Sequence, residues 1–152
     1  FCIQGGTAMV RGYGEILEPL EPLKNCRMLI SKPPVGISTA ECFARYDALG
    51  KPYGIPGNPV IKKAVNAGDL SAVCQLLYNA LEEVVELPEV QEIRETMLKA
   101  GGSGSCMTGS GSAVFGIFPR SEQQESAARA LKRKGYFTCR CSPVNYGATI
   151  TE

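Results

Sequence analysis

Apolar residues recur at helical spacing through the middle of the chain. The first stripe consists of Leu70, Cys74, Leu77, Leu81 and Val84. Asp69 precedes this stripe as a suitable capping residue, so the pattern predicts one long helix with a single buried face. A second stripe follows, made of Val90, Ile93 and Met97. Pro88 suits the first position of that helix and Gly101 suits the position just after its end.

Two further helices begin with apparent capping boxes. Ser38 is followed three positions later by Glu41, and the same spacing separates Ser121 from Gln124. In a capping box each of the two side chains satisfies a free backbone N–H group of the first turn. We therefore expect helices from residue 38 to about 49 and from residue 121 onwards. A short helix is predicted over residues 60–66, after an irregular loop at 51–58 that is rich in proline and glycine.

Short apolar or alternating runs predict the strands. They lie at residues 7–11, 15–20, 27–31, 112–118 and 136–141. The first two flank a Gly-Tyr-Gly turn and should form a hairpin. Short strands separated by helices indicate an α+β fold, and the natural packing is a ferredoxin-like antiparallel sheet with helices on one face.

A run of glycine and serine separates the second apolar stripe from the strand at 112–118. Residues 101–111 include five glycines and offer little to pack. Such a backbone can adopt positive φ angles, and its N–H groups can form a nest for an anion. A plain helix-to-strand connector is an equally good interpretation. No Gly-Lys-Ser/Thr sequence follows, so this is not a Walker A loop. We expect residues 103–110 to be mobile.

Composition excludes several classes of protein. The 152 residues carry a formal net charge of +1, so no bulk electrostatic field favours nucleic acid or a membrane surface as a partner. No apolar run reaches the length of a transmembrane helix. There are seven cysteines, no histidine and no C-x-x-C pair, which disfavours a zinc site or a disulfide scaffold. Reduced cysteines in a cytoplasmic protein fit best.

Five segments occur in the order found in one family of enzymes. They are residues 5–8 (GGTA), 11–17 (RGYGEIL), 31–41 (SKPPVGISTAE), 79–82 (NALE) and 107–116 (MTGSGSAVFG). Together they resemble the C-terminal half of the 4-diphosphocytidyl-2-C-methyl-D-erythritol kinases, which belong to the GHMP kinase superfamily. The segment at 32–41 favours this family over a sister GHMP kinase. The resemblance implies a GHMP kinase C-terminal domain at 26–152, with residues 1–25 closing the N-terminal domain and linking the two.

The resemblance also implies an activity for the parent protein. The family phosphorylates the 2-hydroxyl of a cytidine diphosphate derivative with ATP, in the non-mevalonate route to isoprenoid precursors. The intact enzyme would use ATP and Mg²⁺, and we expect neither to be bound by this chain alone. The family's catalytic aspartate, its lysine and its main phosphate loop would fall before Phe1, so no catalytic residue and no metal ligand is assigned here. We expect an inactive fragment whose partners are the substrate and the missing N-terminal domain.

Residue by residue, the resemblance implies three contacts to the substrate. Tyr13 matches a substrate-contacting position, while Thr39 and Phe43 match positions that line a cytidine pocket. A supporting role beside the phosphates is implied for Gly109, Ser110, Gly111 and Ser112. The alternative for Phe43 is a core aromatic residue, and the alternative for Tyr13 is an exposed turn residue.

Other polar residues have simpler interpretations. Asn79 and Glu82 are better explained as helix-surface or loop-anchoring groups than as ligands. Cys106 has no histidine partner to activate it, so we assign it no nucleophilic role. One alternative for the whole chain is another GHMP small-molecule kinase. A second is a stand-alone ferredoxin-like module whose glycine-rich loop binds a small ligand.

Overall fold

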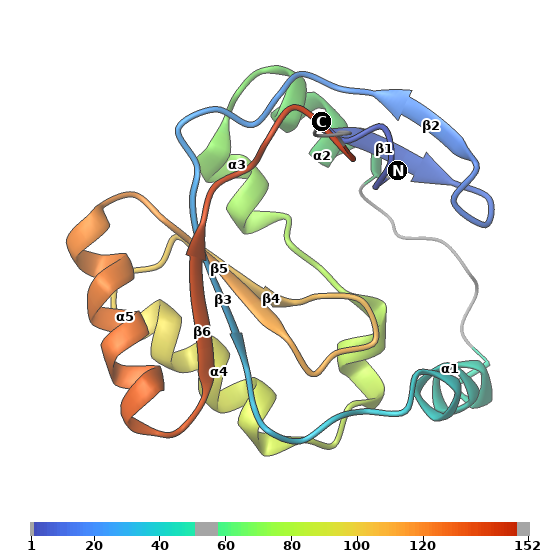
Figure 1. The fold of residues 1–152 in the computed structure, drawn as a ribbon. Coiled ribbons are helices and arrows are strands. Elements are labelled where there is room, and N and C mark those ends of the chain that lie inside the picture. Colours follow the sequence, from blue (N-terminus) through green and yellow to red (C-terminus); the bar gives the residue numbers. More distant parts are fainter. Residues whose placement is uncertain (1, 51–57, 149–152) are drawn as a thin grey trace.

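The computed structural model describes residues 2–50 and 58–148 (Figure 1). Within these residues the central sheet has four strands, β3 (Arg27–Lys32), β4 (Gly104–Met107), β5 (Val114–Phe118) and β6 (Phe137–Cys141). Their order is β4-β5-β3-β6, and each neighbouring pair is antiparallel. Helices follow the first and third of these strands. This arrangement is the split βαβ topology of ferredoxin-like folds.

Two helices cover one face of the sheet. Figure 1 shows α4 (Pro88–Lys99) and α5 (Ser121–Arg133) side by side on this face. Leu29 and Phe118 of the sheet are fully buried against them, together with Ile93, Met97 and Leu131 of the helices. The predicted α+β fold, with its antiparallel sheet and helical layer, is confirmed.

A shorter helix, α3 (Leu70–Gln75), lies against the opposite face of the sheet. Its Cys74 is buried in a cluster with Ile117 of β5. Successive side chains of a strand point to opposite faces, so Ile117 and Phe118 serve different cores. The second apolar layer was not predicted, and its presence explains why β5 is apolar on both faces.

The N-terminal hairpin forms a sheet of its own. It pairs β1 (Ala8–Arg11) with β2 (Ile16–Pro19), as predicted. Glu18 of β2 forms an ion pair with Lys62 of α2 (Asn58–Asn66), and the Asn66 side chain accepts a hydrogen bond from the Glu21 amide at 3.1 Å. The hairpin is thus fastened to α2, whereas the four-stranded sheet begins at Arg27. The proposed division of the chain at residue 25 stays a prediction.

The long helix predicted after Asp69 is broken. Helix α3 ends at Gln75, and a separate 3₁₀ helix, η1 (Ala80–Val84), follows. Between them, Asn79 has extended backbone angles (φ −133°, ψ 113°) and caps η1 with its side chain. The spacing of the apolar residues was therefore correct, but they belong to two elements. Leu77 packs in the core beside α3, while Leu81 packs in the core beneath α4.

The glycine-rich stretch contains a strand that was not predicted. All four residues of β4 are buried, so a mobile loop at these positions is wrong. A Cβ atom added to Gly104 would lie 2.9 Å from Cys74 Cβ and 2.9 Å from Leu77 Cδ1. The absence of a side chain therefore lets β4 pack closely on α3. The connecting turn is confined to residues 108–113.

Of the two predicted capping boxes, only the first has its cap. Ser38 Oγ accepts a hydrogen bond from the Glu41 amide at 3.3 Å at the start of α1 (Thr39–Ala48). At α5 the cap position is Arg120, and the predicted partner Gln124 is buried, donating instead to the Met28 carbonyl at 2.7 Å. The irregular loop predicted at 51–58 falls outside the described residues, except for residue 58, which begins α2.

Candidate functional site

The candidate site is built on the turn between β4 and β5. Gly109 and Gly111 have φ angles of +58° and +85°, which side chains other than hydrogen rarely permit. The Thr108 amide donates to the Ala113 carbonyl at 2.9 Å, and the Gly111 amide donates to the Thr108 carbonyl at 3.1 Å. Residues 108–113 therefore form a tight, hydrogen-bonded turn rather than a long open loop.

The segment that joins β3 to α1 meets this turn. Thr39 Oγ1 lies 2.8 Å from Ser110 Oγ, a hydrogen-bonding distance. The buried Ser112 hydroxyl donates to the Val35 carbonyl at 2.5 Å. Thr39, which was predicted to line the cytidine pocket, is thus in direct contact with Ser110, which was predicted to lie beside the phosphates.

Phe43 lies one helical turn beyond Thr39 on α1, and 51% of its surface is exposed. This exposure is inconsistent with the alternative of a core aromatic residue. Tyr13 is fully exposed at the tip of the hairpin, where its amide donates to the Glu15 carboxylate. No hydrogen bond or ion pair among the described residues joins Tyr13 to Thr39 or Phe43.

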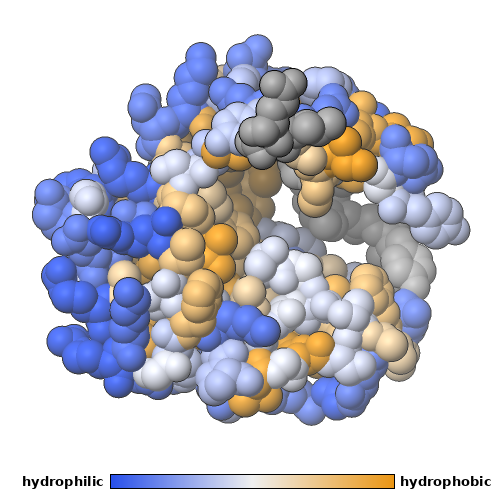
Figure 2. All heavy atoms as spheres, in the orientation of Figure 1, coloured by the Kyte–Doolittle hydropathy of each residue, from blue (hydrophilic) through white to orange (hydrophobic). Residues whose placement is uncertain are grey.

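The hairpin and α1 nevertheless lie on the same side of the molecule in Figure 1. Figure 2 shows the surface hollowed between the parts of the chain that carry them. The full exposure of Tyr13 fits the alternative of an exposed turn residue. That Tyr13, Thr39 and Phe43 contact one substrate stays a prediction.

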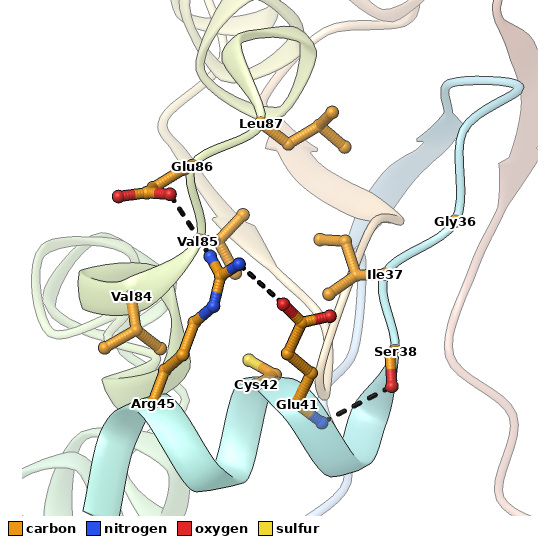
Figure 3. A pocket seen from close by; sticks show the side chains of 10 residues that line it. All are labelled: Gly36, Ile37, Ser38, Glu41, Cys42, Arg45, Val84, Val85, Glu86 and Leu87. Atoms are coloured by element: carbon orange, nitrogen blue, oxygen red, sulfur yellow. Dashed lines mark hydrogen bonds and ion pairs between the residues drawn. The ribbon is translucent and has the colours of Figure 1, made fainter. Parts of the chain in front are cut away.

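A pocket lies beside the first turns of α1. It has a volume of about 230 Å³ and is lined by residues 36–38, Glu41, Cys42, Arg45 and residues 84–87. Figure 3 shows Arg45 between two carboxylates, 2.6 Å from Glu41 and 3.2 Å from Glu86. Burial raises the pKa of the Cys42 thiol. Sequence reasoning missed this pocket, and the i, i+4 spacing of Glu41 and Arg45 was the only signal for any part of it.

Asn79 and Glu82 hold the turn from beneath, which supports the loop-anchoring interpretation over the helix-surface one. The Asn79 amide group donates to the Met107 carbonyl at 2.9 Å and to the Gly109 carbonyl at 2.8 Å. Glu82 accepts a hydrogen bond from the Met107 amide, and its other oxygen lies 2.9 Å from Arg94. Asn79 is engaged with two backbone carbonyls, and Glu82 is engaged with a backbone amide and Arg94. Neither side chain is therefore available to bind a ligand.

The chemistry that the turn offers is neutral hydrogen bonding. Burial raises the pKa of Cys106 to about 12, so this thiol stays protonated near neutral pH and is no nucleophile. In the described parts of the chain, no group of three or more histidine, cysteine, aspartate or glutamate side chains could hold a metal ion. None of the described helices is long and apolar enough to cross a membrane. Backbone amides and hydroxyl groups of this kind bind and orient anionic ligands.

Comparison with known proteins identifies relatives in sequence. The chain is 41% identical over 133 residues to a 4-diphosphocytidyl-2-C-methyl-D-erythritol kinase of Alkaliphilus metalliredigens, which covers 86% of this chain and 45% of that protein. It is 40% identical over 146 residues to a kinase of the same name from a Synechococcus species, covering 88% and 47% of the two chains. The chain therefore spans about half the length of the curated relatives it matches.

Solved structures with the same fold include two kinases. A crystal structure of 4-(cytidine 5'-diphospho)-2C-methyl-D-erythritol kinase matches with a TM-score of 0.67 and 28% identity, covering 88% of this chain and 48% of that one. Homoserine kinase from Cytophaga hutchinsonii matches with a TM-score of 0.74 over 96% of this chain and 51% of that one. At 19% identity the second likeness concerns the fold alone.

A family model described as GHMP kinases C terminal matches residues 61–136, which is half of the chain. The matched part runs from α2 through the 108–113 turn to the residue before β6. It therefore includes both the helical layer and the turn on which the candidate site is built. The resemblance inferred from the five sequence segments is confirmed, and the chain belongs to the GHMP kinase family through its C-terminal domain.

Proposed function

We propose that this chain is the C-terminal, substrate-binding part of a kinase that phosphorylates the 2-hydroxyl of 4-diphosphocytidyl-2-C-methyl-D-erythritol with ATP. The reaction belongs to the non-mevalonate route to isoprenoid precursors. The observation that carries the proposal is that curated relatives of this name, such as the 41% identical protein of Alkaliphilus metalliredigens, align with most of the chain. The mevalonate kinase of L. major, by contrast, is only 18% identical.

Within this proposal α1 and the turn share the work of holding the substrate. The exposed ring of Phe43 offers a face on which a cytosine base can stack. The contact between Thr39 and Ser110 joins that base-binding side to the turn. Gly109, Ser110, Gly111 and Ser112 would form the turn beside the phosphates, where the buried Ser112 hydroxyl fastens the turn to Val35. Tyr13 would contact the substrate from the hairpin.

ATP and Mg²⁺ belong mainly to the other half of the protein in this proposal. Residues 108–113 contain neither lysine nor a carboxylate, and these are the groups that normally contact nucleotide phosphates and magnesium. Phosphoryl transfer depends on positioning and electrostatic stabilisation. This chain would contribute by orienting the acceptor substrate, while the N-terminal domain supplies the base, the nucleotide cradle and the metal ligands.

We place the protein in the cytoplasm. All seven cysteines are unpaired, which fits a reducing compartment. Four of them, Cys26, Cys42, Cys74 and Cys106, are buried as apolar packing groups.

A domain exchange tests the proposed function. The C-terminal half of the Alkaliphilus metalliredigens kinase would be replaced by this chain, and phosphorylation of 4-diphosphocytidyl-methylerythritol would be followed by ³¹P NMR. We expect turnover by the fusion and none by this chain alone. The intact Alkaliphilus kinase, prepared in parallel, controls for the assay. A folded fusion that phosphorylates homoserine or mevalonate instead, or only binds nucleotides, would refute the assignment.

A further inference from the structure

One side chain of the site, that of Asn79, has both its amide nitrogen and its amide oxygen engaged in hydrogen bonds. Asn79 makes three hydrogen bonds: its amide nitrogen donates to the carbonyls of Met107 and Gly109, and its oxygen accepts from the Leu81 amide at 3.0 Å. The three partners fix the orientation of the amide, because reversing it would set its oxygen against two carbonyl oxygens. Asn79 therefore links the start of η1 to both sides of Thr108.

The contact with Gly109 also fixes the direction of the next amide group, the Ser110 N–H. In a trans peptide unit the C=O and N–H bonds point in opposite directions within one plane. Because the Gly109 carbonyl points at Asn79, the Ser110 N–H points away from Asn79. In the parts of the chain that the structure describes, no acceptor is found for this N–H group. It is thus presented as a free donor beside the Ser110 hydroxyl, which meets Thr39.

A second clamp holds the same strand end. Glu82, on η1 like Leu81, accepts from the Met107 amide and is itself held by Arg94 of α4 at 2.9 Å. The side chains of Glu82 and Arg94 are 17% and 32% exposed, so this pair is partly shielded from water. Both the N–H and the C=O of Met107 are therefore held from η1 and its cap residue. Among the described residues, only the Asn79 side chain also holds the Gly109 carbonyl.

We propose that Asn79 is a positioning residue for the reaction, which turns the peptide between Gly109 and Ser110 so that the Ser110 amide faces a phosphate group in the site. This inference rests on the proposed kinase function. The phosphate group belongs either to the diphosphate of the cytidyl substrate or to ATP. Asn79 does not touch the ligand and acts through the backbone that it orients. When a backbone donor is displaced slightly from its proper position, kcat falls more than substrate binding weakens.

The variant Asn79→Asp isolates this role. Aspartate has nearly the same shape and is an equally good helix cap, so the bond from Leu81 survives. Its carboxylate, however, would face the two carbonyls that the amide now satisfies. The matched control is Asn66→Asp, because within residues 2–50 and 58–148 the Asn66 side chain bonds through its oxygen, as acceptor from the Glu21 amide. Asn79→Ser is a second variant, which keeps the cap but is too short to reach the carbonyls.

Both variants and the control would be made in the fusion enzyme described above. For Asn79→Asp and Asn79→Ser we expect kcat to fall by about tenfold to a hundredfold, with KM for the cytidyl substrate changed by less than about threefold. Asn66→Asp should leave both constants unchanged. An unchanged kcat, or a change confined to KM, would overturn the positioning role. So would loss of folding in both Asn79 variants, measured by circular dichroism, because the residue would then serve stability alone.

The ¹⁵N resonance of the Ser110 amide gives an independent readout. In the fusion it should shift on addition of CDP if it faces the substrate diphosphate, or of ATP if it faces the nucleotide, and the shift should be lost in Asn79→Asp. A response to neither ligand overturns the inference. If the fusion is inactive toward the cytidyl substrate, the proposed function fails. The orientation of the peptide is then still decided by whether Asn79→Asp, unlike Asn66→Asp, moves the Ser110 resonance in this chain.

Discussion

Replacing Gly104 by alanine should change the free energy of unfolding in opposite directions for a buried strand and for an open loop. In a solvent-exposed loop with ordinary φ and ψ angles, alanine stabilises a protein by about 0.4–1 kcal/mol, since it restricts the unfolded chain. In the structure the new methyl group would lie 2.9 Å from Cys74 Cβ, 2.9 Å from Leu77 Cδ1 and 3.0 Å from the Cys74 carbonyl oxygen. Rotation of Leu77 can relieve one of these contacts.

The contacts with Cys74 are harder to relieve, because they involve its Cβ and backbone oxygen within α3. Overpacking of this kind costs about 1–3 kcal/mol. After the gain from the unfolded chain is subtracted, we expect Gly104→Ala to lower the free energy of unfolding by about 1–2 kcal/mol. With a urea m value of about 2 kcal/mol/M, the midpoint should fall by about 0.5–1 M.

The matched control is Gly36→Ala. A Cβ atom at Gly36 would meet nothing within 4 Å. Alanine there should leave the midpoint unchanged or raise it slightly. Urea unfolding followed by circular dichroism at constant pH compares the two variants with the parent chain. A midpoint for Gly104→Ala equal to or above that of the parent chain would refute the close packing of β4 on α3.

Three further outcomes are expected. Ser38→Ala removes the acceptor at the start of α1 and should cost about 1 kcal/mol in urea unfolding, and an unchanged midpoint would contradict the cap. A hydrogen bond from the Tyr136 hydroxyl to Glu92 raises the pKa of Tyr136 to about 12. The hydrogen bond to the protonated Tyr136 therefore stabilises the folded state fully below the unfolded pKa of about 10, and this stabilisation is lost as the pH rises to about 12. Tyr136→Phe should flatten the pH dependence of the free energy of unfolding in that window, as measured by urea unfolding. Iodoacetamide should alkylate the exposed Cys139 well before the buried Cys106, as read by mass spectrometry, and equal rates would show that β4 opens readily.

Local periodicity predicted the elements that depend on near neighbours. The stripe of Val90, Ile93 and Met97 is buried on α4 as expected. The strand predicted at 27–31 is β3, one residue longer, and the hairpin pairs as predicted. These successes share a cause: an amphipathic pattern within ten or so residues is enough to decide which side of an element faces the core.

The failures arose where a partner distant in sequence outweighs the local pattern. The apolar spacing from Leu70 to Val84 suits one helix, but Asn79 is drawn out of it by carbonyls 28 and 30 residues away. Gln124 has the spacing of a capping residue and instead satisfies the Met28 carbonyl, 96 residues away. A buried carbonyl without a partner is costly, so the long-range bond prevails over the local one.

By itself the sequence determined the α+β class, most of the elements, the family and the residue types that the site could contain, because these follow from short patterns and from five ordered segments. Only the tertiary structure decided that the glycine-rich stretch is largely a buried strand, because nothing local shows that Gly104 lies against α3. Only the tertiary structure brought Thr39 to Ser110, 71 residues apart, and placed Asn79 beneath the turn. Such contacts arise when sheet and helices pack together, and no spacing along the chain records them.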